Sequence, residues 1–205
     1  MAVEGTRIEL KTSRIEALSD NVFAFSLTIL IVGFDILIAP QKNISEPQLF
    51  GILYGLLPDF LHYVEGFVII GAFWLEHHQQ FHYIKRTNPK LLFINIAGLM
   101  FIALIPFSTT IAGDYGELYL AALLFELNLL MAGLVMYAQW SYATSHKRLV
   151  DASLDKHTID FHKRRNLIIP IVSLVAISIS HFNPRVGTVL YFIVPFLLIF
   201  HKDGE

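Results

Sequence analysis

Carboxylates and imidazoles at helical spacing are the residues of this sequence that could do chemistry. Glu16 and Asp20 lie four positions apart, which places both on one face of a helix. Two acids in that arrangement repel each other unless a cation joins them. Acids are also common at a helix start, because the positive end of the helix dipole attracts them. The spacing alone favours this ordinary helix start over a cation site.

A denser cluster occupies residues 73–82, Phe-Trp-Leu-Glu-His-His-Gln-Gln-Phe-His. His78 and His82 lie one helical turn apart with Glu76 nearby, a spacing that could hold a divalent metal. Such a metal needs further ligands, and the remaining histidines are isolated apart from a loose pair at positions 157 and 162. Tryptophan and polar residues commonly anchor helix ends at a membrane surface. We therefore predict anchoring or helix–helix bonding here, with no metal and no cofactor.

A third group combines Asp59, His62 and Glu65 with Glu126 and Asn128. Asp59 and His62, and likewise His62 and Glu65, are three positions apart and could touch on a helix. A proton-coupled transporter could use such groups as a relay. Alternatively, Asp59 and His62 lie near a membrane surface while Glu65 and Glu126 pair inside the bundle. The sequence leaves both interpretations open.

The elements that position these residues are predicted to be membrane-spanning helices. Hydrophobic residues make up 55% of the 205 residues, charged residues only 16%, and the mean hydropathy is +0.57. Residues 91–113 form a run of 23 uncharged residues and residues 166–184 a run of 19. About 20 apolar residues span a bilayer as a helix, and continuous apolar runs favour helices over alternating barrel strands.

Charge and cysteine content exclude several classes of protein. The net charge is −2 and no basic block is present, so no nucleic-acid partner is expected. The chain has no cysteine, which excludes disulfides, thiolate metal sites and cysteine nucleophiles. No nucleophile–base pair or complete ligand set appears either, and we do not expect an enzyme.

The hydropathy pattern predicts one all-α membrane domain over residues 1–205 with six transmembrane helices. The expected spans are about 15–38, 48–80, 91–112, 117–143, 166–181 and 186–201. Pro58 lies inside the long second span and marks either a kink or the true start of the helix. Asn183-Pro184 predicts a tight turn between the last two spans.

The basic residues support this count independently. With six spans and a cytoplasmic N-terminus, 13 of the 15 Lys and Arg residues fall on the cytoplasmic side, and only Lys42 and Arg185 fall outside. The positive-inside rule predicts such a bias, which five or seven spans would spoil. We therefore expect a multi-pass protein of the cell membrane with cytoplasmic termini and a cytoplasmic 144–165 segment.

The body of the first span holds an apolar stripe at Phe25, Ile29, Val32 and position 36, with Thr28 beside it. The helix is apolar nearly all round, so periodicity does not tell which face meets lipid, protein or water. By itself the pattern favours an ordinary buried helix. Asp35 near the outer end could attract cations to a mouth or simply end the span.

Two of these passages resemble a known family. Arg14-x-x-x-Leu18-Ser19-Asp20 resembles the Arg-x-x-x-Phe-Ser-Asp signature that opens the first helix of the transmembrane protein 175 family of lysosomal potassium channels. Phe73-Trp74-x-x-His77-His78-x-x-Phe81 is similar to the aromatic-histidine segment of its prokaryotic members. Leu18 stands where the family usually has Phe, which should affect packing more than conduction.

The resemblance implies a single-repeat prokaryotic homotetramer in which the first helices line the pore, without a Thr-Val-Gly-Tyr-Gly filter. By position, it implies a gate at Phe25, a selectivity role for Thr28, and further pore lining at Ile29 and Val32. The two motifs should lie at the same depth, at the inner end of the first span, where a hydrogen-bonded cluster could fix the pore helix. We therefore predict a structural role there for six residues, Arg14, Ser19, Asp20, Trp74, His77 and His78.

The function expected from this resemblance is a potassium-selective cation channel in the lipid bilayer with a hydrophobic constriction on the first helix. The alternative is a proton- or metal-coupled transporter that uses Glu65, Glu126 and the histidines at 77, 78 and 82. The sequence does not indicate what would open the pore.

Overall fold

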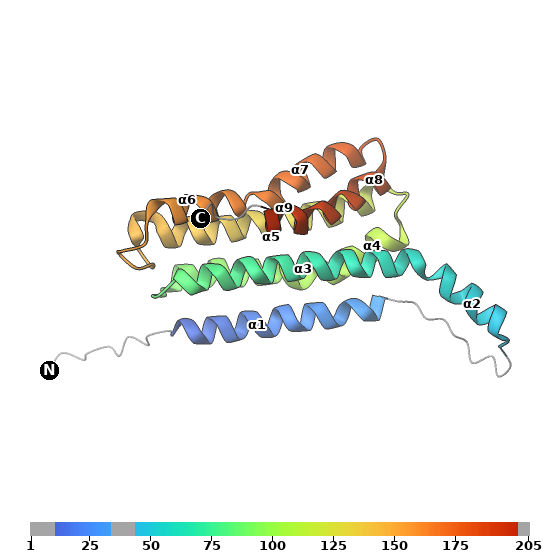
Figure 1. Ribbon diagram of the computed structural model, residues 1–205, viewed down its shortest axis with the longest axis horizontal. Coiled ribbons are helices and arrows are strands. Elements are labelled where there is room, and N and C mark those ends of the chain that lie inside the picture. Colours follow the sequence, from blue (N-terminus) through green and yellow to red (C-terminus); the bar gives the residue numbers. More distant parts are fainter. Residues whose placement is uncertain (1–10, 34–43, 201–205) are drawn as a thin grey trace.

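The computed structural model describes residues 11–33 and 44–200, and helices account for nearly all of the regular structure in these ranges. An isolated antiparallel bridge joins Ile84 to Val150. The expectation of an all-α protein is therefore confirmed for the described ranges. The helices lie roughly along one long axis (Figure 1).

The first helix, α1, runs from Thr12 to Ile29 and continues as a 3-10 turn, η1, over Leu30–Gly33. Together they match the expected first span as far as Gly33. The rest of that span, with Asp35 and position 36, lies outside the described residues.

The second predicted span is divided into two helices. Helix α2 covers Glu46–Gly55 and α3 covers Leu57–Tyr83, with a bend of 45° between them. Pro58 lies in the first turn of α3, where its missing N–H breaks no helical hydrogen bond. It therefore marks the start of a helix, and α2 extends past the end of the bundle (Figure 1).

Helices α4 (Pro89–Asp114) and α5 (Tyr119–Thr144) form a long antiparallel pair at the centre of the bundle. Asn88 begins α4, because its side chain accepts a hydrogen bond from the Leu91 N–H at 2.9 Å. Both helices agree with the expected third and fourth spans to within a few residues.

The remaining helices are shorter. A 3-10 turn, η2 (Ser145–Lys147), leads to the polar helix α6 (Lys156–Arg165) and then to α7 (Ile168–Ser180). After a turn capped by Asn183, the chain continues through α8 (Pro184–Val189), η3 (Leu190–Ile193) and α9 (Val194–Phe200). The predicted turn at Asn183-Pro184 is therefore present.

Not all six predicted spans have the length of a transmembrane helix. Among the described residues three helical segments are long and apolar enough to cross a membrane, and the bent pair of α2 and α3 brings the number to four if it is counted as one span. Helix α7 has 13 residues, which is about 20 Å of helix against roughly 30 Å of hydrocarbon. A multi-pass membrane protein is established, whereas the six-span count stays a proposal.

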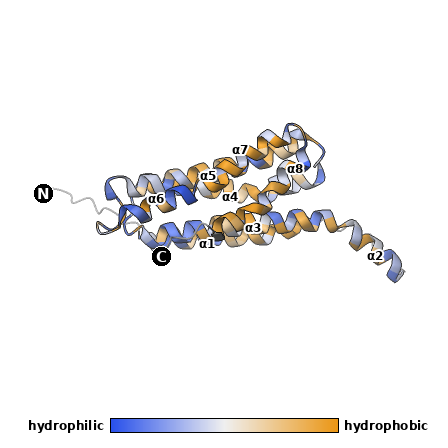
Figure 2. Ribbon diagram, turned by 45° about the horizontal axis from the view of Figure 1, so that its top comes forward, coloured by the Kyte–Doolittle hydropathy of each residue, from blue (hydrophilic) through white to orange (hydrophobic). Residues whose placement is uncertain are grey.

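Apolar side chains fill the middle of the bundle. Its main core joins α1, α3, α4, α5 and α7 through buried residues such as Phe23, Ile70, Ile105 and Leu129. A smaller core near α6 includes Ile84 and Val150. The middle of the bundle is mainly hydrophobic, and hydrophilic residues are dense around α6 (Figure 2). The core holds α1 against α3 and α4, which defines the two faces of α1.

Candidate functional site

Helix α1 and its 3-10 extension present two faces in opposite environments. The side that packs against α3 and α4 holds the buried residues Ile15, Ser19, Phe23, Ser26 and Leu30. On the other side, Phe25 is 66% exposed, Ile29 37% and Val32 73%, and Thr28 is exposed as well. All four residues expected to line a pore thus lie on the face that the described chain leaves uncovered. A continuous apolar face of this kind requires lipid or a protein partner.

Thr28 interrupts this apolar face with a hydroxyl group. Its Oγ1 donates a hydrogen bond to the carbonyl of Phe25 at 2.9 Å. A hydroxyl that donates its single proton still has two lone pairs. Thr28 therefore presents an oxygen acceptor on the exposed face, one turn from Phe25.

A chain of buried hydrogen bonds fastens the first half of α1 to α3 and α4. His77 Nε2 donates to Asn95 Oδ1 at 2.9 Å, and Asn95 Nδ2 donates to Ser19 Oγ at 3.1 Å. Ser19 Oγ then donates to the Ile15 carbonyl at 2.9 Å. A connected buried network of this kind fixes the relative positions of its helices, because each lost bond would leave a polar group unsatisfied.

A second contact lies one residue further along α1. Trp74 Nε1 donates to Asp20 Oδ1 at 2.9 Å, and the Trp74 ring stacks on His78 with centroids 5.6 Å apart. The His77 ring packs between two phenylalanines, with centroids 5.6 Å from Phe23 and 4.5 Å from Phe81. These contacts bring the tryptophan-histidine segment of α3 against the middle of α1.

Arg14 is the member of the predicted set that this cluster does not include. Its side chain is exposed and forms no hydrogen bond or ion pair with another described residue. Its structural role stays a prediction.

Asn95 is the residue that the sequence reasoning missed. It lies in α4 and is 2% exposed, and it links His77 to Ser19. The sequence does contain a signal for Asn95, which is a lone amide near the start of the uncharged 91–113 run. A polar group inside a span is costly and usually has a partner, so this position indicates a buried hydrogen bond.

The glutamate beside the histidines has a different partner. Arg165, at the end of α6, donates to Glu76 in a largely buried ion pair. His78 and His82 are exposed, and the described residues contain no group of three His, Asp or Glu side chains that could hold a metal. Glu76 therefore joins α3 to α6, which weakens the interpretation of this segment as a metal site.

The third group of candidate residues lies toward the other end of the bundle. His62 and Glu65 contact each other, with Nδ1 and Oε2 3.2 Å apart. Glu126 accepts a hydrogen bond from Ser180, and Asn128 donates to Ser108 at 3.2 Å. The structure shows no direct hydrogen bond between Glu65 and Glu126. Each keeps one buried carboxylate oxygen without a hydrogen-bond partner among the described residues.

Comparison with known proteins agrees with the resemblance. The family model of the endosomal/lysosomal potassium channel TMEM175 matches residues 14–106. A potassium channel of Streptomyces collinus is 31% identical over 149 residues, which is 71% of this chain and 70% of that protein. A potassium channel of Chamaesiphon minutus is 30% identical over 174 residues, 83% of this chain and 84% of that protein.

One solved structure provides a comparison of the fold. It is the crystal structure of a lysosomal potassium-selective channel TMEM175 homolog from Chamaesiphon minutus. The two folds agree with a TM-score of 0.78 at 24% identity, over 94% of this chain and 98% of that one.

Proposed function

Because this chain belongs to the family of the endosomal/lysosomal potassium channel TMEM175, we propose that it is a potassium channel with its pore along the exposed face of α1. The observation that carries the proposal is the contrast between the two sides of that helix. One side is packed and hydrogen-bonded within the chain, whereas the other presents Phe25, Ile29 and Val32 without cover from the described residues. The hydrogen bonds from Trp74 to Asp20 and from His77 to Asn95 support the proposal, because they attach α3 to α1 and α4.

The pore requires more than one copy of the chain. A single α1 encloses no space, so identical helices must be supplied by symmetry around a central axis. We propose a homotetramer with four α1 helices at its centre, as the resemblance implies. A strictly monomeric species in mild detergent that still conducts potassium would contradict this assembly.

Conduction would be controlled by the width of stacked apolar rings. Rings of Phe25, Ile29 and Val32 exclude water when they are narrow, and an ion does not enter without its water. Dilation lets water in and permits conduction. The Thr28 hydroxyl would then offer an oxygen ligand to a partly dehydrated ion. A weakly coordinating pore favours potassium because potassium sheds its water at a lower free-energy cost than sodium.

The proposed topology places the α6 end of the bundle in the cytoplasm of a cell-membrane protein. Its support is the distribution of Lys and Arg over six proposed spans. The chain has no cysteine, so a single cysteine at exposed Glu46 or Ala152 can be labelled cleanly. An impermeant thiol reagent added outside should label Glu46→Cys and leave Ala152→Cys unlabelled. Equal labelling of both would contradict the topology.

The decisive experiment separates the channel from the transporter alternative. That alternative keeps some support, because Glu65 and Glu126 are buried carboxylates with unsatisfied oxygens. Purified protein in liposomes is placed under opposed potassium and sodium gradients. We expect a passive current whose reversal potential follows the potassium gradient. Saturable flux that requires a pH gradient or a second ion would favour the transporter.

A further inference from the structure

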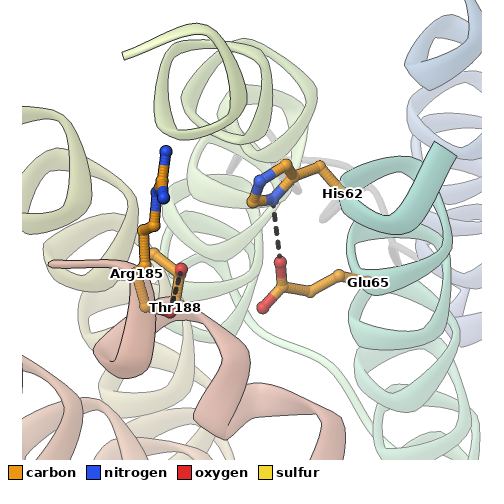
Figure 3. A network of polar contacts seen from close by, with 4 residues as sticks. All are labelled: His62, Glu65, Arg185 and Thr188. Atoms are coloured by element: carbon orange, nitrogen blue, oxygen red, sulfur yellow. Dashed lines mark hydrogen bonds and ion pairs between the residues drawn. The ribbon is translucent and has the colours of Figure 1, made fainter. Parts of the chain in front are cut away.

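A cavity lies on the side of the subunit away from α1. Its volume is about 880 Å³, and it is bounded by α3, the connection between α4 and α5, α8 and η3. Most of its wall is apolar and includes Leu61, Leu118, Val189 and Phe192. Its polar lining includes His62 and Glu65 on α3 and, across the space from them, Arg185 and Thr188 on α8 (Figure 3). This volume is in the range of small-molecule sites.

Glu65 is the main polar residue of the cavity. Its side chain is 2% exposed, and its carboxylate extends from α3 toward α8 (Figure 3). Oε2 contacts His62 Nδ1 at 3.2 Å, whereas Oε1 is buried without a hydrogen-bond partner among the described residues. An unsatisfied buried carboxylate oxygen is costly, and a bound N–H donor would remove that cost.

The nearest fixed cation does not fill this role. Arg185 forms an ion pair with Glu117 at the rim, where both side chains are more than two-thirds exposed. Figure 3 shows its side chain directed away from Glu65. Thr188 Oγ1 donates to the Arg185 carbonyl at 3.1 Å and so keeps its lone pairs as acceptors. Among the described residues, neither Arg185 nor Thr188 therefore donates to Glu65 Oε1.

We propose that this cavity binds an amphiphilic ammonium, a protonated primary amine that carries an apolar chain. An ammonium has three N–H donors. The cavity offers Glu65 Oε1 and Thr188 Oγ1 as acceptors, together with His62 Nε2 when the Nδ1 proton is donated to Glu65. The chain would lie along the apolar wall. An anion would be repelled by Glu65, and a bare potassium ion would find too few oxygens among apolar side chains.

Two sources could supply this chemistry, the ethanolamine headgroup of a phospholipid or a free alkylamine. The site lies apart from the proposed pore face and does not depend on conduction. Its test is therefore a binding measurement on the detergent-solubilised protein, which remains valid if the channel proposal fails.

The primary test compares three amphiphiles of equal chain length that differ only in head group: octylamine, octanol and octanoate at pH 7.5, where the amine is protonated. The readout is the thermal unfolding midpoint. We expect a saturable rise with octylamine alone, because a ligand that binds only the folded state stabilises it. Equal shifts with all three would show an unselective apolar cleft and overturn the proposal.

Glu65→Gln tests the predicted contact, with Glu126→Gln as the matched control. Glu126 is also a buried glutamate but does not line the cavity. We expect the Kd for octylamine to rise about 10-fold or more in Glu65→Gln, as for the loss of a charge-assisted hydrogen bond, and to stay unchanged in Glu126→Gln. An unchanged Kd in Glu65→Gln would overturn the site.

Val189→Trp provides a second route if Glu65→Gln does not fold. Val189 lies on the cavity wall and is 57% exposed, so a large ring there should occupy the cavity without disturbing the core. Octylamine binding should be lost, and binding at wild-type strength would again overturn the proposal. Native mass spectrometry then identifies the source: a retained phosphatidylethanolamine that Val189→Trp displaces supports the lipid, and octylamine binding without it supports the free amine.

Discussion

The two faces of α1 differ in what each requires from the rest of the chain. On the packed face, Ser19 and Phe23 have specific partners on α3 and α4, and any change there alters the position of the helix. On the exposed face, Phe25 and Val32 have no such partners in the described chain. The comparison teaches that the packing of α1 depends on one side of the helix, whereas the proposed gate lies on the other side. Substitutions on one side should therefore cost stability, and substitutions on the other should alter conduction.

The largest expected effect separates two phenylalanines only two positions apart. Phe23 is 1% exposed and packs against His77. Phe23→Ala should lower the free energy of unfolding by about 3–5 kcal/mol, the usual cost of emptying a buried aromatic site. Phe25→Ala should leave stability nearly unchanged in a measurement on dissociated subunits. Thermal unfolding in detergent compares them, and equal destabilisation would mean that the two faces are not distinct.

Asn95→Leu tests the polar attachment of the packed face. The variant keeps the volume but leaves His77 Nε2 and Ser19 without their amide partner, so we expect a loss of about 2–4 kcal/mol from two unsatisfied buried groups. Asn128→Leu is the control. Asn128 donates a single hydrogen bond, to Ser108, and its Oδ1 is already unsatisfied among the described residues. Its loss should cost about 1 kcal/mol or less. A similar loss in the free energy of unfolding in both variants would show that the link from Asn95 to α1 stabilises the protein no more than a single buried hydrogen bond.

On the exposed face, Phe25→Ala should open the barrier. Removing four phenyl rings widens the apolar constriction and lets water enter, so the resting current should increase about tenfold or more, with weaker preference for potassium over sodium. Current recordings from the reconstituted protein, in its proposed tetrameric form, measure both effects. An unchanged current in a correctly assembled variant would show that the gate is formed by another residue.

Asp20→Ala and Arg14→Ala sharpen the structural assignment. Asp20 accepts a hydrogen bond from the Trp74 indole N–H. Asp20→Ala should therefore lower the free energy of unfolding by about 1–2 kcal/mol and reduce assembly together with current. Arg14 has no polar partner among the described residues, so the same loss in Arg14→Ala would place its partner in another subunit or outside the described ranges. Size-exclusion profiles measure assembly. If Asp20→Ala assembles normally and changes only selectivity, the structural role is wrong.

The smallest expected effect is that of Thr28→Val. The substitution keeps the side-chain volume and removes the hydroxyl, which should lower potassium selectivity about 2- to 10-fold without raising the resting current. Reversal potentials measure selectivity. A rise in resting current to the level of Phe25→Ala would show that Thr28 is part of the steric barrier.

The sequence by itself determined the fold class, because long uncharged runs in a bilayer must be helical. It also determined the family, since both motifs occur, the first with Leu18 in place of the usual Phe, and the comparisons confirm the match. The contact of His62 with Glu65 was predictable as well, because residues three apart on one helix are neighbours.

Only the tertiary structure decided which groups far apart in the sequence meet. Asn95 reaches Ser19 across 76 positions, and Glu76 meets Arg165 across 89. It also decided which side of α1 is packed, because a helix that is apolar nearly all round has no periodicity that separates its faces. The physical reason is that the spacing of residues along the sequence determines which side chains are neighbours on one helix. The partners on other helices depend on how the whole bundle packs.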